Sequence, residues 1–358
     1  MRIELKERTE PRKKQWWHIP LLLFLIAGTI YIIRTNNPDG TPKSGAWPQQ
    51  EVQRCEGAIF GTFYHITYQY SHDIEDSLVA VMNEVDRSLS PFNKESIITA
   101  VNHNKDMEVN EMFSEVFMLA KRVNEQTSGA FDITVAPLVN AWGFGFQHKE
   151  DISDALIDSL METVGMEKVN LEGNKVVKTD PRVMLDCSAI AKGYGVDAVG
   201  RELERLGVKN YLVEIGGELR MRGINPSGAT WRVGINKPIE DLSGETNEIE
   251  QVVELSNQSM ATSGNYRNYY EEGGKKYAHT IDPKTGQPVQ HSILSSTVIA
   301  NDCATADAYA TAFMVLGLDS ARQVLNHHPE LSAYFIYTDS IGNYATWNSD
   351  KMAKNLVE

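Results

Sequence analysis

The order of the strand-like and helix-like segments is the feature of this sequence that most constrains the fold. Aromatic and β-branched stretches at 211–222, 231–236 and 251–255 follow one another with no helical pattern between them. Two further stretches, 333–338 and 344–347, are predicted to form a closing hairpin. Parallel strands need long crossover connections, whereas antiparallel strands join through short turns. The clustering therefore predicts an α+β fold, with a mostly antiparallel sheet core and flanking helices.

Helical patterns occur before and after this group of strands. Five segments are predicted as helices: 74–90, 111–127, 152–164, 191–206 and 302–316. The aromatic stretch 59–70 is predicted as one strand, bulged at its Gly-Thr break, and 184–187 as a short strand end.

The first 54 residues predict a membrane attachment. Residues 1–15 form a basic tail, and the 18 residues from Trp16 to Ile33 are almost wholly apolar and closed by Arg34. Paired Trp residues and a basic cluster suit a single-pass anchor over 16–34 with the tail in the cytoplasm. Residues 35–54 are then a Pro/Gly-rich linker, and 55–358 an exported body in the periplasm of a bacterium. A cleaved signal peptide stays an alternative.

Charge and cysteine content exclude some classes of function. The 358 residues carry a formal net charge of −14, which divides into +4 over residues 1–34 and −18 over the rest. An acidic body argues against nucleic acid as a partner, because such binding needs clustered positive charge. The three cysteines, Cys55, Cys187 and Cys303, have neither disulfide-framework nor zinc-site spacing.

Asp307 and Thr311 are the first candidate site. They lie four residues apart on a predicted helix, so both side chains face the same way. A carboxylate and a hydroxyl are hard oxygen ligands of the kind that Mg²⁺ accepts beside phosphate. Taken alone, such a pair is more often a solvated or capping feature.

Three other segments carry candidate chemistry. Asp186 precedes the helix that starts near Lys192, a junction suited to binding ribose or phosphate. The following glycines match the dinucleotide fingerprint only loosely, which leaves a nicotinamide oxidoreductase as a weak alternative. Polar and aromatic residues at 130–145 are compatible with a flat ring pocket or with a buried loop. His279 stands just before an Asp-Pro-Lys-Thr-Gly turn and is a candidate general base.

Eight motifs in order give the sequence a family resemblance. They are GTFYHITY, FDITVAPLVNAWGFG, LDCSAIAKGYGVD, YLVEIGGELRMRG, WRVGINKP, ATSGNYRNYY, HTIDPKTGQPV and DCATADAYATAF. Over about residues 56–348 the chain resembles the ApbE family, the FAD:protein FMN transferases, and an ApbE-like fold is expected.

The resemblance implies a site and a reaction. Mg²⁺ would bind Asp307, Thr311 and the backbone oxygen of Ala189, where relatives have Thr or Ser. His279 and Asp307 would be the catalytic residues. FAD would contact a larger set, in which Phe60 stands where relatives often have Met: Phe60, Phe92, Ala130, Phe131, Asp132, Asp186, Lys192 and Ile281.

The partners also follow from the resemblance. FMN would pass from FAD to a Thr or Ser of an acceptor flavoprotein, such as an Nqr- or Rnf-type subunit of a membrane electron-transport complex, and AMP would leave. Many relatives are lipoproteins, but no Cys closely follows the apolar run here, so a transmembrane anchor is expected instead. An FAD pyrophosphatase and a non-catalytic periplasmic flavin-binding protein stay open as alternatives.

Overall fold

The computed structural model describes residues 46–147, 149–238, 248–265, 269–272, 275–290 and 292–357. Its strands are β1 (Val52–Ile59), β2 (Thr62–Gln69), β3 (Val169–Glu172), β4 (Lys175–Lys178), β5 (Tyr211–Ile215), β6 (Glu218–Arg222), β7 (Trp231–Asn236), β8 (Ile249–Leu255), β9 (Gln258–Gly264), β10 (Tyr269–Glu272), β11 (Lys275–Ala278), β12 (Ile293–Ala300), β13 (Ser332–Thr338), β14 (Tyr344–Asn348) and β15 (Leu356–Val357). Its α-helices are α2 (Glu75–Leu89), α3 (Ile97–Asn102), α4 (Glu111–Gln126), α5 (Ala136–Ala141), α6 (Asp154–Met161), α7 (Ala191–Arg205) and α8 (Cys303–His327).

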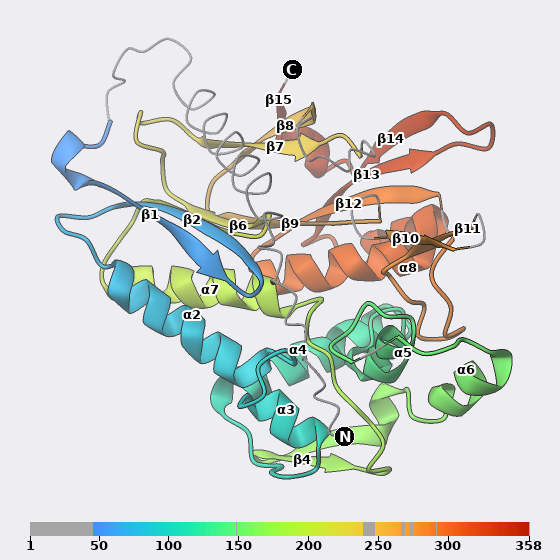
Figure 1. Ribbon diagram of the computed structural model, residues 1–358. Helices are drawn as coiled ribbons and strands as arrows, with labels where there is room; N and C mark the ends of the chain where they lie inside the picture. Colours follow the sequence, from blue (N-terminus) through green and yellow to red (C-terminus); the bar gives the residue numbers. More distant parts are fainter. Residues whose placement is uncertain are drawn as a thin grey trace, which may run out of the picture.

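An eight-stranded sheet forms the centre of the fold. Its order is β1-β2-β5-β6-β9-β12-β13-β14, and every neighbouring pair is antiparallel. Figure 1 shows helices α2, α7 and α8 along one face of this sheet and the small sheet β15-β8-β7 on the other. The predicted α+β class with a mostly antiparallel core is therefore confirmed.

Alternation along the strands divides the apolar residues between two layers, because successive side chains point to opposite faces. On β5, Tyr211, Val213 and Ile215 pack with apolar residues of α2 and α7. The intervening Leu212 packs on the other face with Trp231 of the small sheet. Both faces are thus apolar, so this part of the sheet lies in the middle of a three-layer arrangement.

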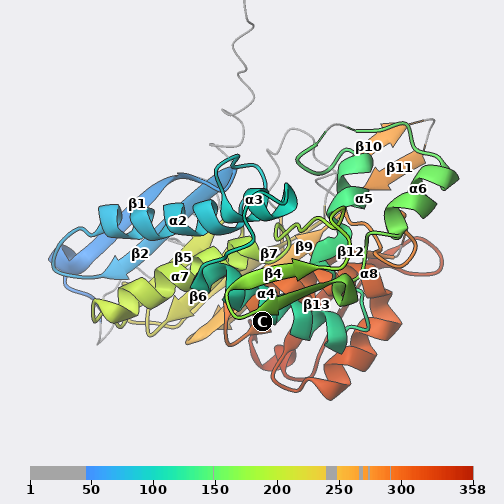
Figure 2. The same cartoon turned by 90° about the horizontal axis from the view of Figure 1, so that it is seen from below.

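A third apolar cluster fills the part of the molecule below α7 and α8. It joins α4 and α8 with the irregular segment before α7, and Phe113, Phe117 and Phe313 are among its fully buried side chains. Figures 1 and 2 place α5, α6 and the β10–β11 hairpin together at one end of the molecule. Ile281, shortly after β11, packs there against Leu138 and Ile157.

Several predicted elements differ from the observed ones. The predicted helices correspond to α2, α4, α6, α7 and α8, within a few residues except that α8 continues to His327. It does so across a kink at Gly317, whose φ of 73° is non-helical. The stretch 59–70 is not one bulged strand: Phe60 and Gly61 both adopt positive φ and form the two-residue turn that joins β1 to β2 in a hairpin. Residues 184–187 belong to no strand.

The folded body starts earlier than the expected boundary at residue 55. Residues 46–54, assigned to a linker by composition, include the start of β1 and the buried Trp47. Trp47 packs edge-on against Trp231, with 5.9 Å between ring centroids, and its backbone N–H donates to the carbonyl of Pro226. Composition misled here because Pro and Gly surround a tryptophan that closes the apolar layer of the small sheet.

The predicted basic tail and the anchor over 16–34 lie outside the described residues. Within the part that the structure describes, none of the helices combines the length and apolar character that crossing a membrane requires.

We expect Trp47→Ala to lower the free energy of unfolding by about 3 kcal/mol, since a buried tryptophan is lost from a packed layer. Urea denaturation of the full chain measures this. Tyr344→Ala is the matched control, because Tyr344 is 67% exposed and its loss should change stability by less than about 0.5 kcal/mol. Equal small effects of both substitutions would show that residues 46–54 are a linker after all.

Candidate functional site

The close approach of α7 and α8 places Asp307 in a buried position. Asp307 is only 2% exposed, and its Oδ2 accepts a hydrogen bond from the backbone N–H of Gly193 at 3.0 Å. A Cβ atom on Gly193 would lie 2.4 Å from the carbonyl oxygen of Cys303, which no side chain tolerates. Glycine at 193 thus lets the two helices meet and fixes one oxygen of the carboxylate.

Lys192 and Glu218 complete a charged group beside Asp307. The Lys192 Nζ lies 2.6 Å from Oε1 of Glu218 and 4.0 Å from Oδ1 of Asp307. Glu218 begins β6 and is 2% exposed. Burial raises the pKa of Glu218, and the ammonium of Lys192 acts in the opposite direction. Burial lowers the pKa of Lys192, but Asp307 and Glu218 outweigh it and hold that pKa above its ordinary value.

Thr311 lies one turn after Asp307 on the same face of α8, as predicted. Its hydroxyl is 3.0 Å from the Oγ of Ser263 on β9, so α8 is tied to the central sheet at this point. Ala189 is half-buried two residues before α7 and packs against the large apolar cluster. The structure therefore brings Asp307, Thr311 and Lys192 into one region of α7 and α8. Ala189 belongs to the segment that leads into α7.

Asp132 and Asp186 come from two segments that lie side by side. The N–H of Asp186 donates to the carbonyl of Ile133 at 2.7 Å. One oxygen of Asp132 accepts from the N–H and the hydroxyl of Thr134, and Asp186 accepts from the N–H of Ser188. Burial raises the pKa of both carboxyls, against these hydrogen bonds. Each carboxylate thus accepts hydrogen bonds from the residue two positions later and stabilises the turn there.

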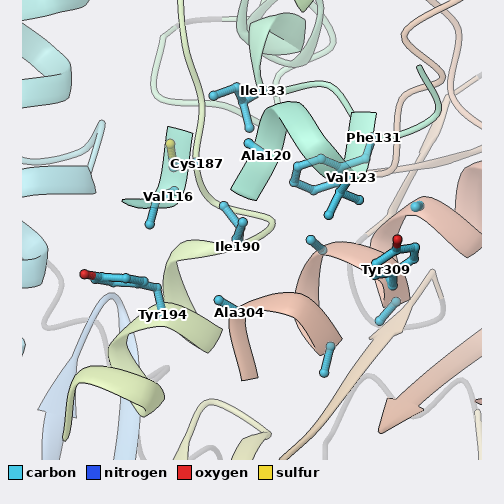
Figure 3. Packing of buried hydrophobic residues seen from close by; sticks show 14 of the residues in the cluster. Val116, Ala120, Val123, Phe131, Ile133, Cys187, Ile190, Tyr194, Ala304 and Tyr309 are labelled. Atoms are coloured by element: carbon cyan, nitrogen blue, oxygen red, sulfur yellow. The ribbon is translucent and has the colours of Figure 1, made fainter. Parts of the chain in front are cut away.

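Apolar side chains of the core pack against these two segments. Figure 3 shows Ile133, Cys187 and Ile190 gathered with Val116 and Ala120 of α4, next to the first turns of α7 and α8. Phe131, one of the predicted flavin contacts, points into this core and is buried, and so is its neighbour Ala130. Contact of these two residues with a ligand would therefore involve mainly their backbone.

Phe60 has a strained backbone. Its φ of 52° lies in the left-handed region, which costs a non-glycine residue about 1–2 kcal/mol. The ring lies against α7, since a Cβ on Gly195 would be 2.5 Å from its Cε2 atom. Strain of this kind is found at functional sites, where the surrounding structure maintains it. The ring therefore lies beside Gly195, three residues after Lys192, and a ligand contact at Phe60 stays a prediction.

Of the remaining predicted residues, Phe92 and His279 belong to a second group, the ring group, and Ile281 packs near it. Phe92 is 63% exposed, and its ring meets that of Phe146 edge-on with 6.2 Å between centroids. His279 is half-buried, and its ring lies 6.4 Å from that of Phe144. Ile281 is buried in the cluster with Leu138. These rings come from loops, in contrast to the Asp307 group, which lies on α7, α8 and β6.

The Asp307 group has the chemistry of an incomplete cation site. Among the described residues, no set of three or more His, Cys, Asp or Glu side chains is arranged to hold a metal ion. A cation at Asp307 would have a single carboxylate and would take other oxygens from Thr311, the backbone, water or a phosphate. Mg²⁺ accepts such coordination, because it retains waters and binds substrate phosphates.

Comparison with known proteins identifies the family. The model of the ApbE family matches residues 60–335. The chain belongs to the ApbE family. The FAD:protein FMN transferase of Haemophilus influenzae is 38% identical over 324 residues, covering 86% of this chain and 92% of that protein. The FAD:protein FMN transferase of Escherichia coli K12 is 33% identical over 347 residues, covering 93% and 96%.

Solved ApbE structures share the fold. The flavin transferase ApbE from Vibrio cholerae superposes with a TM-score of 0.77 at 33% identity, over 86% of this chain and 99% of that one. The ApbE protein of Thermotoga maritima gives 0.75 at 26% identity, over 86% and 100%. The family and the ApbE-like fold expected from the eight motifs are therefore confirmed.

Three side chains near the predicted site were not singled out from the sequence. Glu218 and Ser263 each stand inside a motif, but single-sequence patterns gave no reason to separate them from neighbouring strand residues. The signal for Glu218 was a carboxylate directly after Gly216-Gly217, at the start of a strand facing the core. Phe146 follows a glycine-rich stretch and is recognisable only through its contact with Phe92.

We expect Gly193→Ala to destabilise the protein by about 2 kcal/mol, because the new methyl group must push the backbone of α8 away. Gly195→Ala is the matched control: the three atoms nearest to its methyl group belong to the ring of Phe60, a side chain that yields more easily than a helix backbone, and alanine favours the helix. Urea unfolding of both variants gives the comparison. A Gly193→Ala variant as stable as Gly195→Ala would show that the contact between the helices is not tight.

Proposed function

We propose that this ApbE-family chain is an FAD:protein FMN transferase that uses Mg²⁺ to move the FMN half of FAD onto a Thr or Ser hydroxyl of an acceptor flavoprotein, releasing AMP. The transferase activity is supported by the family and by relatives that carry this name. The metal, the acceptor and the roles of individual residues are the proposed part.

The observation that carries the proposal is how few partners the Asp307 carboxylate has. One oxygen is held by the N–H of Gly193, and the other lies 4.0 Å from Lys192, beyond hydrogen-bond reach. A buried residue whose carboxylate has so few partners favours a bound cation. Thr311 adds a neutral oxygen one turn away, and the ammonium of Lys192 adds a positive charge suited to phosphate.

The reaction then follows from the substrate. The acceptor hydroxyl oxygen attacks the phosphorus of the FMN half of the pyrophosphate, and the bond from that phosphorus to the bridging oxygen breaks. AMP leaves with the bridging oxygen, and FMN stays on the acceptor as a phosphoester. Mg²⁺ bound at Asp307, Thr311 and the Ala189 carbonyl would supply neutralisation of the developing phosphate charge. Lys192 holds a phosphate oxygen, and His279 takes the hydroxyl proton as general base.

The ring group suits the flavin and adenine parts of FAD. Phe92 offers an exposed face, and Phe60 is held in a strained turn against α7. Asp132 and Asp186 supply carboxyl oxygens to sugar or base edges, while Ala130, Phe131 and Ile281, whose side chains are buried, would meet FAD through backbone atoms.

We further propose that the body works in the periplasm, attached to the inner membrane through residues 16–34. An acceptor such as an Nqr- or Rnf-type subunit would present its hydroxyl on that side. The 18-residue apolar stretch with its basic flank supports this orientation.

The direct test is to incubate the full chain in detergent with FAD, Mg²⁺ and a candidate acceptor protein, and to look for in-gel flavin fluorescence on the acceptor. We expect a fluorescent acceptor band that depends on Mg²⁺. Release of free FMN at the same rate with and without acceptor would instead indicate an FAD pyrophosphatase. FAD that stays intact would indicate a flavin-binding protein without turnover.

We expect Asp307→Ala to reduce transfer by more than about 100-fold at fixed Mg²⁺, since it removes the only charged ligand of the proposed site. Asp319→Ala is the control, because Asp319 is exposed on the same helix. Flavin transfer and thermal unfolding are measured for both. Undiminished transfer by Asp307→Ala at saturating Mg²⁺ would refute the metal assignment.

We expect His279→Ala to lower the transfer rate by about 100-fold or more while changing FAD affinity little, because a general base acts on the acceptor proton. His327→Ala, an exposed histidine at the end of α8, is the control. Single-turnover rates and FAD binding by fluorescence separate the two effects. Equal losses of rate and affinity would make His279 a binding residue instead.

A further inference from the structure

We propose that Glu218 is a positioning residue that holds the Lys192 ammonium away from Asp307, so that the Asp307 carboxylate stays open to a cation and Lys192 stays poised for phosphate. This inference rests on the proposed function. It concerns a residue outside the set that the family resemblance implies.

The backbone fixes Glu218 tightly. It follows the Gly216-Gly217 turn, whose φ angles of 62° and 102° only glycine adopts easily, and β6 then pairs with β5 from Glu218 onward. A Cβ on Gly216 would lie 2.7 Å from the Cγ2 of Thr62. The start of β6 thus has little freedom to move, and it presents the Glu218 carboxylate to Lys192 of α7.

Other cations on this face have partners of their own. Arg220, two residues along β6 and on the same side of the sheet, pairs with Asp197 at 2.7 Å and with Glu204 at 3.1 Å. Lys192, at 2.6 Å, is the cation that meets Glu218.

Two buried carboxylates compete for this one ammonium. Asp307 and Glu218 are each 2% exposed, and a lysine between two such groups would pair with either. The distances show which one prevails: Glu218 is in contact at 2.6 Å and Asp307 is not, at 4.0 Å. Without Glu218, Lys192 has Asp307 as its nearest anion, and an ion pair there would compete with a metal ion for the same oxygen.

The second oxygen of Glu218 is a further indication that a ligand binds here. Its Oε2 is buried and has no hydrogen-bond partner. A buried carboxylate oxygen in that state is costly, so it is expected to be compensated when the site is filled. The three side chains together carry a net charge of −1 when both carboxyls are ionised, and a divalent cation reverses that sign. FAD phosphates would then meet a positive site with Lys192 already directed at them.

The test is Glu218→Gln in the full chain, which keeps the shape and removes the charge. The first measurement is a metal-free crystal structure, where we expect the Nζ of Lys192 to move from 4.0 Å to about 2.8 Å from Asp307 Oδ1. The second is Mg²⁺ titration by calorimetry, where we expect affinity to fall by about tenfold or more. An unmoved Lys192, or unchanged Mg²⁺ affinity despite movement, would overturn the proposal.

Two further variants keep the outcome interpretable. Glu254→Gln, which breaks the ion pair with Arg232 on β7, should change neither readout. Glu218→Asp retains the charge and should recover part of the Mg²⁺ affinity, which a purely structural role would not produce. If Glu218→Gln does not fold, Glu218→Asp decides. Its shorter carboxylate should let Lys192 approach Asp307 and lower the Mg²⁺ affinity in part. A Lys192 position and an Mg²⁺ affinity equal to those of the wild type would refute the role. If the wild type binds no Mg²⁺, the proposed metal site fails, while the Lys192 position still tests Glu218.

Discussion

The contact between α7 and α8 at Gly193 is the constraint on which the rest of the structure depends. It lets a backbone N–H on one helix hold a carboxylate on the other, with no space for a side chain between them. Because both helices also pack on the central sheet, the position of Asp307 is tied to the register of β6 and β9. The apolar clusters on either side of the sheet therefore determine the geometry of a polar site that contributes little stability itself.

The Asp307 group interrupts the apolar packing between the helices and the sheet. Lys192, Glu218 and Asp307 are drawn into a layer otherwise filled by apolar side chains, and one carboxylate oxygen is left without a partner. Burying such groups lowers stability unless each is fully paired. The cores around them offset this loss. Such departures are expected where function, rather than folding, selects the residues.

The five longest helices and the fold class were predictable because their signals are local, whereas the six-residue helices α3 and α5 were not predicted. The spacing that placed Asp307 and Thr311 on one face needs only the helical period, and the clustering of strands needs only chain order. The central strands β9 and β12 were not predicted, since a polar sequence such as Gln258–Gly264 lacks alternation and is buried only through its neighbours. Glu218 was missed for a related reason: its partner lies 26 residues earlier, and nothing in the sequence states that separation in space.

The two parts of the candidate site differ in how they are supported, and this difference matches two tasks. The charged group lies on α7, α8 and β6, which the large cores hold in place, and phosphoryl transfer depends on accurate positioning of charge. The ring group lies on loops, with Phe92 largely exposed and Phe146 and His279 half-buried. Loops adapt more easily to a ligand that enters and leaves. The proposed transfer from FAD to a second protein would use this combination, with the phosphate fixed at the charged group and the access side open at the ring group.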